Sequence, residues 1–218
     1  MRVVIAGGHG QIALRLERLL VDAGHEAVGI VRNPDHVGDV EATGAEALVL
    51  DLEDAGVDDV ASHLAGADAV VFAAGAGPGS GIPRKDTVDR AASVLLADAA
   101  ERAGVGRFVQ ISSMGAGAPA RQGTDETFAA YLQAKTAAED DLRRRSLDWT
   151  VLRPGGLTNA PGTGGVHLAP SVPRGQVTRD DVAAVLTALL VDGRGVHQTL
   201  ELVAGLTPIA EALATLPA

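Results

Sequence analysis

The segment Gly7-Gly8-His9-Gly10-Gln11-Ile12-Ala13 decides the fold of this chain. It directly follows residues 2–6, a short apolar run typical of a buried strand, and it opens a stretch with helical spacing. The apolar positions of that stretch are Ile12, Leu16, Leu19, Leu20 and Ala23. Gly24 comes next, where a glycine commonly ends a helix. The sequence therefore predicts a strand, a glycine-rich turn and a helix in immediate succession.

The spacing Gly-x-x-Gly-x-x-Ala has a mechanical meaning in that context. Gly7 allows the tight turn, Gly10 lets the backbone approach a pyrophosphate, and Ala13 keeps the helix close to the sheet. The first turn of the helix, with Gln11 and Ile12, then faces the phosphates. We therefore expect a dinucleotide cofactor here.

The rest of the chain alternates short apolar runs with helical patterns, as βαβ units and parallel sheets do. We expect further strands near 26–31, 46–50, 68–73, 106–112, 148–152 and 198–203. We expect further helices over 56–64, 86–103, 124–145, 179–191 and 207–215, and a capping-box-like start at Thr178 and Asp181. The Gly- and Pro-rich stretches 75–83 and 154–175 should be irregular. The predicted fold class is α/β: a Rossmann-type, doubly wound, mainly parallel sheet with helices on both faces and a short C-terminal substrate-side extension.

Composition limits the alternatives. A chain of 218 residues fits one domain spanning 1–218, with a core of Ala, Val, Leu and Ile because aromatic residues make up only 2%. Cysteine is absent and the six histidines are scattered, so we expect no metal site. The net charge of −10 argues against nucleic acid as a partner, and Arg143-Arg144-Arg145 should be a solvated run in the last turn of a helix. Because no apolar run approaches about 20 residues, we expect no membrane partner and a cytoplasmic location.

The end of the second predicted strand bears on nucleotide choice, because an acid there binds the ribose 2′-hydroxyl and repels a 2′-phosphate. This chain has Arg32 at that point. A guanidinium can form a charge-assisted pair with a 2′-phosphate, so NADP(H) is favoured over NAD(H). The alternative is an ordinary exposed Arg32, with Asp35 as the acid that selects NAD.

Two later strand ends should complete the nucleotide site. After the third strand, Asp51 could bond the adenine amino group while Leu52 flanks the ring. After the fourth, Ala73, Ala74 and Gly75 would pack beneath the adenine ribose. These positions mark the carboxyl edge of consecutive strands, where open α/β sheets bind ligands.

Tyr131 and Lys135 form the candidate catalytic pair. They are the only tyrosine and one of two lysines, and residues four apart share a helix face. A neighbouring ammonium favours the phenolate that an acid–base catalyst needs, and Lys135 would also hold the nicotinamide ribose. Ser113, at the end of the fifth strand, would orient a substrate oxygen, whereas strand alternation turns Ser112 to the opposite face. The alternative is a buried aromatic residue followed by a surface lysine.

These motifs together resemble the short-chain dehydrogenase/reductase superfamily, in its atypical NAD(P)H-binding branch of NmrA-like, flavin or biliverdin reductase-like and NAD-dependent epimerase/dehydratase-like proteins. The resemblance rests on four segments: Val4 to Ala13, Arg107 to Ala116, Tyr131 to Lys135, and Leu147 to Gly156.

The resemblance implies further roles. Pro154 and Gly155 would lie beside the nicotinamide carboxamide, and residues 166–175 would line a pocket over the ring together with the loop 114–124. Asp89 lies where extended members often have Asn, so a proton relay is not implied there. Members often form homodimers through helices like 86–103 and 124–145.

Three functions follow as hypotheses. The first is an NADPH-dependent oxidoreductase of a small carbonyl, quinone or flavin-like acceptor. The second is a non-catalytic NADP(H) redox sensor that acts through a protein partner. The third is an epimerase or dehydratase with retained nucleotide. His167 could contact a small-molecule substrate, although a solvent-facing histidine is the expected interpretation.

Overall fold

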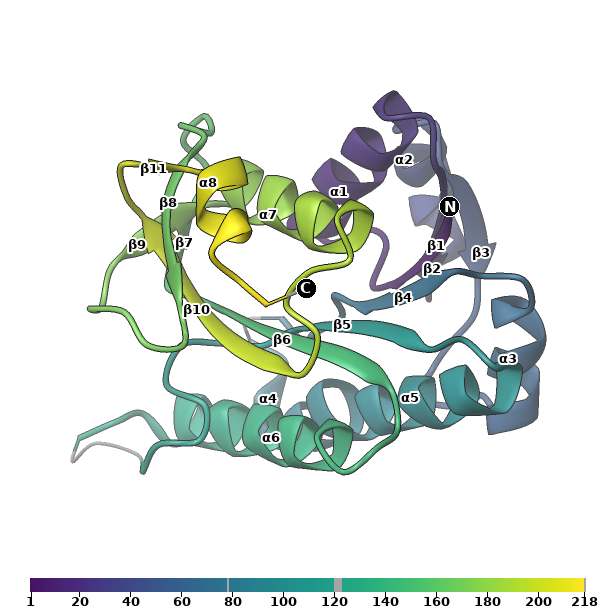
Figure 1. Cartoon of the computed structure of the whole chain (residues 1–218). Coiled ribbons are helices and arrows are strands. Elements are labelled where there is room, and N and C mark those ends of the chain that lie inside the picture. Colours follow the sequence, from purple (N-terminus) through teal and green to yellow (C-terminus); the bar gives the residue numbers. More distant parts are fainter. Residues whose placement is uncertain (78, 120–122, 218) are drawn as a thin grey trace.

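The computed structural model describes residues 1–77, 79–119 and 123–217, and its centre is a nine-stranded sheet (Figure 1). The strand order is β11-β8-β10-β6-β5-β4-β1-β2-β3. The strands are β1 (Arg2–Ala6), β2 (Glu26–Val31), β3 (Glu46–Val49), β4 (Ala69–Phe72), β5 (Arg107–Ile111), β6 (Asp148–Pro154), β8 (Gly165–Ala169), β10 (Gln198–Ala204) and β11 (Thr207–Pro208). All neighbours from β10 to β3 pair in parallel, whereas β8 pairs antiparallel with β10 and β11. The order 3-2-1-4-5-6 is that of a Rossmann sheet, which confirms the predicted fold class.

Helices cover both faces of the sheet (Figure 1). One face carries α1 (Gln11–Asp22), α2 (Val37–Glu41), α7 (Arg179–Val191) and α8 (Ile209–Ala214). The other carries α3 (Val57–Leu64), α4 (Gly81–Arg84), α5 (Ala92–Ala103) and α6 (Glu126–Leu142). Each face has its own buried cluster built mainly from Val, Leu, Ile and Ala. These apolar side chains fit strands that are buried on both faces.

Most predicted elements lie within a few residues of their expected positions. The predicted capping of a helix start by Thr178 is also confirmed, because Thr178 Oγ1 accepts a hydrogen bond from the Asp181 N–H at 3.0 Å. Gly24 follows α1 with a φ of 78°, as a glycine at a helix end does. A short 3-10 turn, Pro34–His36, and α2 were not predicted.

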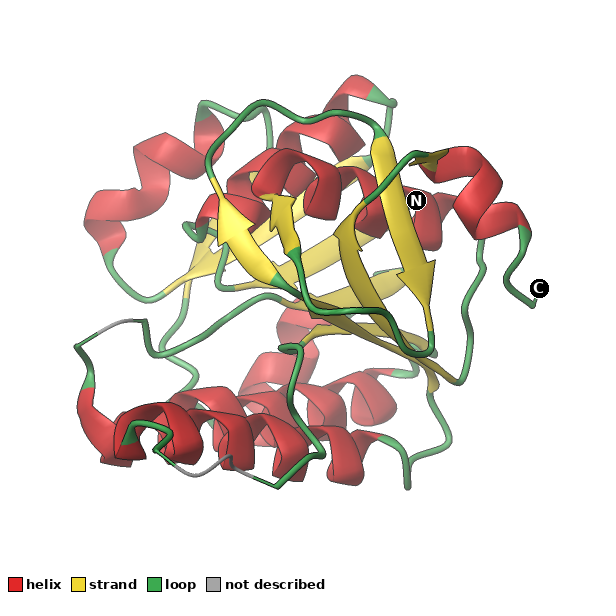
Figure 2. Cartoon of the chain, turned by 90° about the vertical axis from the view of Figure 1, so that its left-hand side faces the viewer, coloured by secondary structure: helices red, strands yellow, loops and turns green. Residues whose placement is uncertain are grey.

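The prediction of an irregular segment over 154–175 was wrong. It contains β8 and also β7 (Gly156–Thr158), which pairs with β9 (Gln176–Thr178) in a separate two-stranded parallel sheet. Figure 2 shows this small sheet beside the end of the large one. In β8, Val166 and Leu168 are buried and His167 is exposed, so the strand does alternate. Five such residues between glycines and prolines are too few for the pattern to stand out.

The predicted helix 86–103 begins differently. α4 leads into the π-helical segment η2 (Lys85–Ala91), and only then into α5. Propensity and periodicity do not distinguish a π-helix from an α-helix, because both use the same residue types. The consequence is a widened turn at residues 85–91.

The predicted solvated run at Arg143–Arg145 also needs correction. α6 ends at Leu142, so Arg143 is its C-cap. The Arg145 side chain is only 11% exposed and pairs with Asp98, Glu101 and Asp141. Arg145 therefore joins α6 to α5, whereas the Arg144 side chain is 71% exposed, as predicted for a solvated run.

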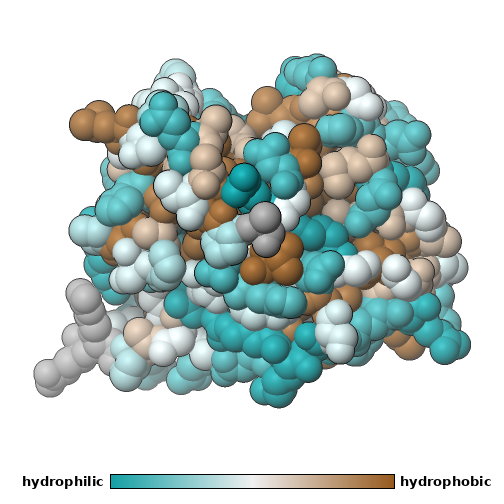
Figure 3. Space-filling model, viewed as in Figure 1, coloured by the Kyte–Doolittle hydropathy of each residue, from teal (hydrophilic) through white to brown (hydrophobic). Residues whose placement is uncertain are grey.

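The surface is mixed in character. Figure 3 shows hydrophobic and hydrophilic side chains interspersed over the side of the molecule that faces the viewer in Figure 1. Within the described ranges, no helix combines the length and the apolar character that crossing a membrane requires.

Candidate functional site

A cleft follows the carboxyl ends of the central strands and consists of two adjoining pockets. The first has a volume of about 340 Å³ and the second about 560 Å³. Both pockets are lined by Gly10, Ala73, Ala74 and Gly75, so they meet at the ends of β1 and β4. The chain leaves β1 and β4 toward opposite faces of the sheet, and such a switch point is where open α/β sheets bind ligands.

The glycine-rich turn contributes to both pockets, because Gly7 lines the first pocket and Gly10 lines both. Gly7 has a φ of 83°, and a Cβ atom there would lie 2.6 Å from the Cα of Ala74. The Gly10 N–H donates to the Gly7 carbonyl at 2.8 Å, which closes the turn. Gly10 caps α1 without a side-chain hydrogen bond, so the first N–H groups of α1 remain available to a ligand. A cradle without side chains beside a helix N-terminus fits a pyrophosphate.

Every predicted cofactor residue lines this cleft. The first pocket contains Gly7, Gly10, Arg32, Asp51, Leu52, Ala73, Ala74 and Gly75. The second contains Gly10, Gln11, Ile12, Ala73, Ala74, Gly75, Lys135, Pro154 and Gly155. Asp35, the alternative selector, lies in the 3-10 turn and is not among the described lining residues of either pocket.

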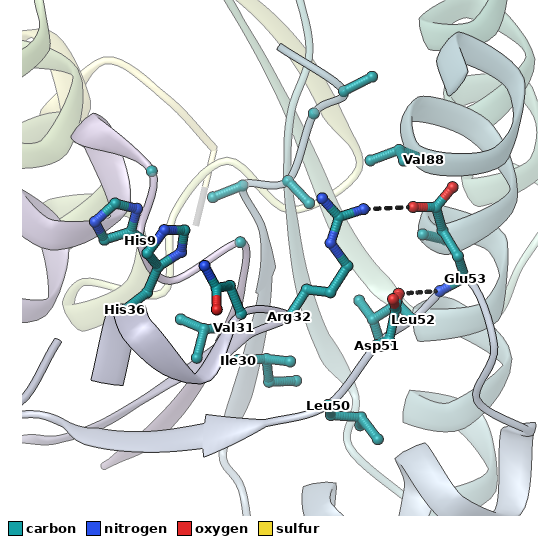
Figure 4. A pocket seen from close by; sticks show the side chains of 18 of the residues that line it. His9, Ile30, Val31, Arg32, His36, Leu50, Asp51, Leu52, Glu53 and Val88 are labelled. Atoms are coloured by element: carbon teal, nitrogen blue, oxygen red, sulfur yellow. Dashed lines mark hydrogen bonds and ion pairs between the residues drawn. The ribbon is translucent and has the colours of Figure 1, made fainter. Parts of the chain in front are cut away.

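Two arginines in the first pocket share the carboxylate of Glu53. Figure 4 shows Arg32 pointing toward that carboxylate. Arg32 Nη1 donates to Glu53 Oε2 at 2.9 Å, and Arg84 Nη2 donates to the same oxygen at 2.5 Å. Thr87 Oγ1 donates to Glu53 Oε1 at 2.7 Å. The Thr87 hydroxyl and the two guanidinium groups hold the pKa of Glu53 below its usual range.

Sequence analysis did not identify Glu53 or Arg84. Glu53 follows Asp51-Leu52 directly, so its place after a strand was a usable signal. Arg84 is distant in sequence, and nothing in the local pattern around α4 points to β2 or β3. Only the packing of α4 at the strand ends brings it to Arg32.

The predicted catalytic residues line the second pocket. Tyr131 and Lys135 come from α6, and Ser113 follows β5. Lys135 Nζ lies 5.8 Å from the centroid of the Tyr131 ring. The same Nζ donates to the carbonyls of Ile111 at 3.3 Å and Ala74 at 3.4 Å. α6 thus positions Lys135 against the ends of β4 and β5.

The neighbouring Ser112 has a structural partner. It is buried and its hydroxyl donates to Glu139 Oε1 at 2.5 Å. Glu139 is fully buried and also accepts from Arg153 and Arg143. This cluster ties the end of β6 to α6, and it therefore fixes Pro154 beside the pocket.

The prediction that residues 166–175 line the second pocket was wrong. None of them is among the described lining residues of the second pocket, because β8 belongs to the main sheet. Of the loop 114–124, residues 120–122 lie outside the described residues, and the remainder is also not among the lining residues. The wall comes instead from the start of α6, from β7 and from the start of α7: Asp125, Thr127, Phe128, Leu157 and Arg179.

Two charged residues of η2 also line the second pocket. Asp89 is completely buried, and its Oδ1 lies 3.3 Å from Lys135 Nζ. Lys85 is 7% exposed and its Nζ lies 5.7 Å from the Tyr131 ring centroid. No sequence motif pointed to either role, because both depend on where η2 packs against α6.

Known proteins show the same architecture. YhfK of Bacillus subtilis, described as an uncharacterized sugar epimerase, is 37% identical over 98% of this chain and 99% of its own. A solved Bacillus halodurans structure, provisionally described as an NAD-dependent epimerase/dehydratase, has a TM-score of 0.90, 36% identity and coverage of 98% and 99%. The oxidoreductase ylbE of Lactococcus lactis has a TM-score of 0.87, 27% identity and coverage of 99% and 96%. These findings confirm the expected resemblance to NAD-dependent epimerase/dehydratase-like and oxidoreductase proteins. The sequence model described as NAD(P)H-binding matches residues 7–193, and this chain belongs to that family.

Proposed function

We propose that the protein is an NADPH-dependent oxidoreductase that reduces a small carbonyl, quinone or flavin-like acceptor. One observation carries this proposal: Ser113, Tyr131 and Lys135 line the same pocket as Pro154 and Gly155, and that pocket is continuous with the glycine-rich turn. A dinucleotide that crosses the turn would place its reactive ring beside the acid–base group. The cleft thus fits a two-part cofactor with chemistry at one end.

The first pocket would hold the adenosine half. Asp51 and Leu52 would flank the adenine, and Arg32 would meet a 2′-phosphate with a charge-assisted pair. Arg84 adds a second guanidinium beside Arg32. The position of Asp35 outside the pocket lining supports the choice of NADP(H).

The second pocket would hold the nicotinamide half and the acceptor. The bound nicotinamide supplies a hydride to the acceptor. Tyr131 would donate its phenolic proton to the acceptor oxygen that gains charge, and Ser113 would orient that oxygen by a hydrogen bond. Lys135 would hold the nicotinamide ribose and stabilise the phenolate left on Tyr131. Exposed Phe128 and Leu157, at 48% and 40% exposure, offer apolar surface to the acceptor body.

The first test is a calorimetric titration of the purified protein with NADPH and NADH. A preference for NADPH of about tenfold, or about 1.4 kcal/mol, is expected. Arg32→Ala should weaken this preference. Arg102→Ala serves as its matched control, because Arg102 pairs with Asp58 outside both pockets. Equal affinities would contradict the role of Arg32.

The second test is NADPH oxidation with a panel of carbonyl, quinone and flavin acceptors. Tyr131→Phe should lower kcat by about a hundredfold or more while nucleotide affinity is retained. An unchanged rate would remove Tyr131 from the mechanism. Tight binding with no turnover of any acceptor would favour a redox sensor.

Epimerase chemistry is the second candidate, because two similar proteins carry epimerase descriptions. The same three residues would then oxidise and re-reduce one substrate with nucleotide that stays bound. Nucleotide that copurifies and survives gel filtration would support this candidate. A protein that loses all nucleotide during gel filtration would count against it.

A further inference from the structure

The π-helical segment η2 carries two buried charged side chains at the candidate catalytic site, Lys85 near the Tyr131 ring and Asp89 against Lys135. Lys85 and Asp89 are four residues apart on η2, and both line the second pocket. η2 packs against α6, the helix that carries Tyr131 and Lys135. π-helical turns are rare and occur frequently at functional sites. The segment is therefore a place to look for groups that act on the tyrosine.

Asp89 offsets the charge of Lys135. Its Oδ1 lies 3.3 Å from Lys135 Nζ, and its Oδ2 accepts from the Ala76 N–H at 3.2 Å. The Lys135 and Asp89 side chains are only 4% and 0% exposed. Water therefore screens this pair little, and the carboxylate cancels much of the ammonium's field at neighbouring atoms.

Lys85 has no anionic partner among the described residues. Its Nζ donates to the carbonyl of Gly77 at 2.7 Å, which is a neutral acceptor. Among the described residues no carboxylate lies within ion-pair distance of Lys85. Lys85, Lys135 and Asp89 together give the site one net positive charge, and without Lys85 that charge would be zero.

Both ammonium groups flank the Tyr131 ring at nearly the same distance. Lys85 Nζ lies 5.7 Å and Lys135 Nζ 5.8 Å from the ring centroid. Cations within about 6 Å of an aromatic centroid are attracted to the ring. A phenolate spreads negative charge over that ring and its oxygen, so a nearby cation stabilises the phenolate more than the phenol.

We propose that Lys85 is a positioning residue of the candidate catalytic site, which stabilises the Tyr131 phenolate and supplies the positive charge that Asp89 offsets at Lys135. This inference rests on the proposed function, because it assigns Lys85 to the step in which Tyr131 gives up its proton. It adds a second lysine to the three residues identified from the sequence.

The test uses the fact that Tyr131 is the only tyrosine of the chain. The near-ultraviolet absorbance of tyrosinate, followed during a pH titration, therefore reports Tyr131 alone and needs neither cofactor nor acceptor. Lys85→Met should move the midpoint of tyrosinate formation to higher pH by about 1 unit. Asp89→Asn should move it to lower pH, because an anion is removed. Lys85→Arg should restore the midpoint, since the charge is kept.

Controls separate this charge effect from packing. Arg90→Met removes a cation of η2 that pairs with Asp86 at the surface, and it should leave the midpoint unchanged. Tyr131→Phe should abolish the signal. The other charged groups lining the pocket, Asp125 and Arg179, are unaltered in all variants. Circular dichroism confirms that each variant is folded at the start of its titration.

The outcomes distinguish this inference from the proposed function. An unchanged midpoint in folded Lys85→Met would overturn the role of Lys85, even if Tyr131→Phe abolishes turnover. A shifted midpoint with no turnover in any acceptor would support the role of Lys85 at the tyrosine and contradict the proposed reductase. An equal shift in Lys85→Met and Lys85→Arg would assign the effect to packing and overturn the inference.

Discussion

Lys135 Nζ lies 3.3 Å from Asp89 Oδ1, in a pair that is almost completely removed from solvent. Breaking a buried pair by removing one partner leaves an uncompensated charge and is strongly destabilising. Lys135→Met should lower the free energy of unfolding by about 3 kcal/mol, measured by urea denaturation. The double variant Lys135→Met/Asp89→Leu should lose less than the single variant, because no buried charge remains. A single variant as stable as the natural chain would contradict this account.

Glu53 should weaken the binding of a 2′-phosphate. Its carboxylate occupies donors of Arg32 and Arg84 and would repel the phosphate. We expect Glu53→Gln to tighten NADPH binding by about tenfold with little change for NADH, whereas Arg32→Ala should weaken NADPH alone. Calorimetry with both nucleotides measures the two ratios, and parallel changes for NADPH and NADH would exclude a role in selection.

The conformation and the surroundings of Gly7 can be tested separately. Gly7 and Gly24 have similar φ values of 83° and 78°, but only a Cβ at Gly7 would meet other atoms, at 2.6 Å from Ala74 Cα. Gly24→Ala should cost about 1 kcal/mol from φ alone. Gly7→Ala should cost clearly more and abolish nucleotide binding. Equal losses in thermal unfolding would show that the turn tolerates the methyl group.

A buried acid on α1 makes stability depend on pH. Glu17 is fully buried, its Oε1 has no hydrogen-bond partner among the described residues, and burial raises its pKa from 4.5 to about 8. The folded state therefore keeps a proton that the unfolded state loses. Its contribution is fully present below pH 4.5 and is lost as the pH rises through about 8.

Glu17→Gln removes this titration. Stability of the natural chain should fall by up to about 1.4 kcal/mol per pH unit inside that window. The variant should show a flatter profile in urea denaturation between pH 5 and about 8. A slope that persists in the variant would assign the pH dependence to other groups.

The sheet was largely predictable because its strands are apolar on both faces. Val3, Val4, Ile5 and Ala6 make a continuous apolar run after Arg2, and Ala69 to Phe72 of β4 repeat that arrangement after Asp68. β7, β8 and β9 were not predictable in the same way. They are three to five residues long and lie among glycines and prolines, so their pairing depends on tertiary contacts.

The candidate site was predictable where local motifs determine it. Gly7, Gly10, Tyr131 and Lys135 follow spacings whose meaning is set by one strand or one helix. Glu53, Arg84, Lys85 and Asp89 have no such spacing, because they reach the cleft through the packing of α4 and η2 against other elements. Charged residues whose place in the cleft depends on contacts between different helices and strands can be identified only from the structure.

Among the described lining residues, the two pockets share Gly10, Ala73, Ala74 and Gly75, none of which has a side chain larger than a methyl group. This junction lies at the ends of β1 and β4, so its shape depends on the backbone of the sheet and not on rotamers. Substitutions around Arg32 and around Phe128 consequently act in separate compartments. The architecture is modular: one half of the cleft can change what it recognises while the other half keeps its geometry.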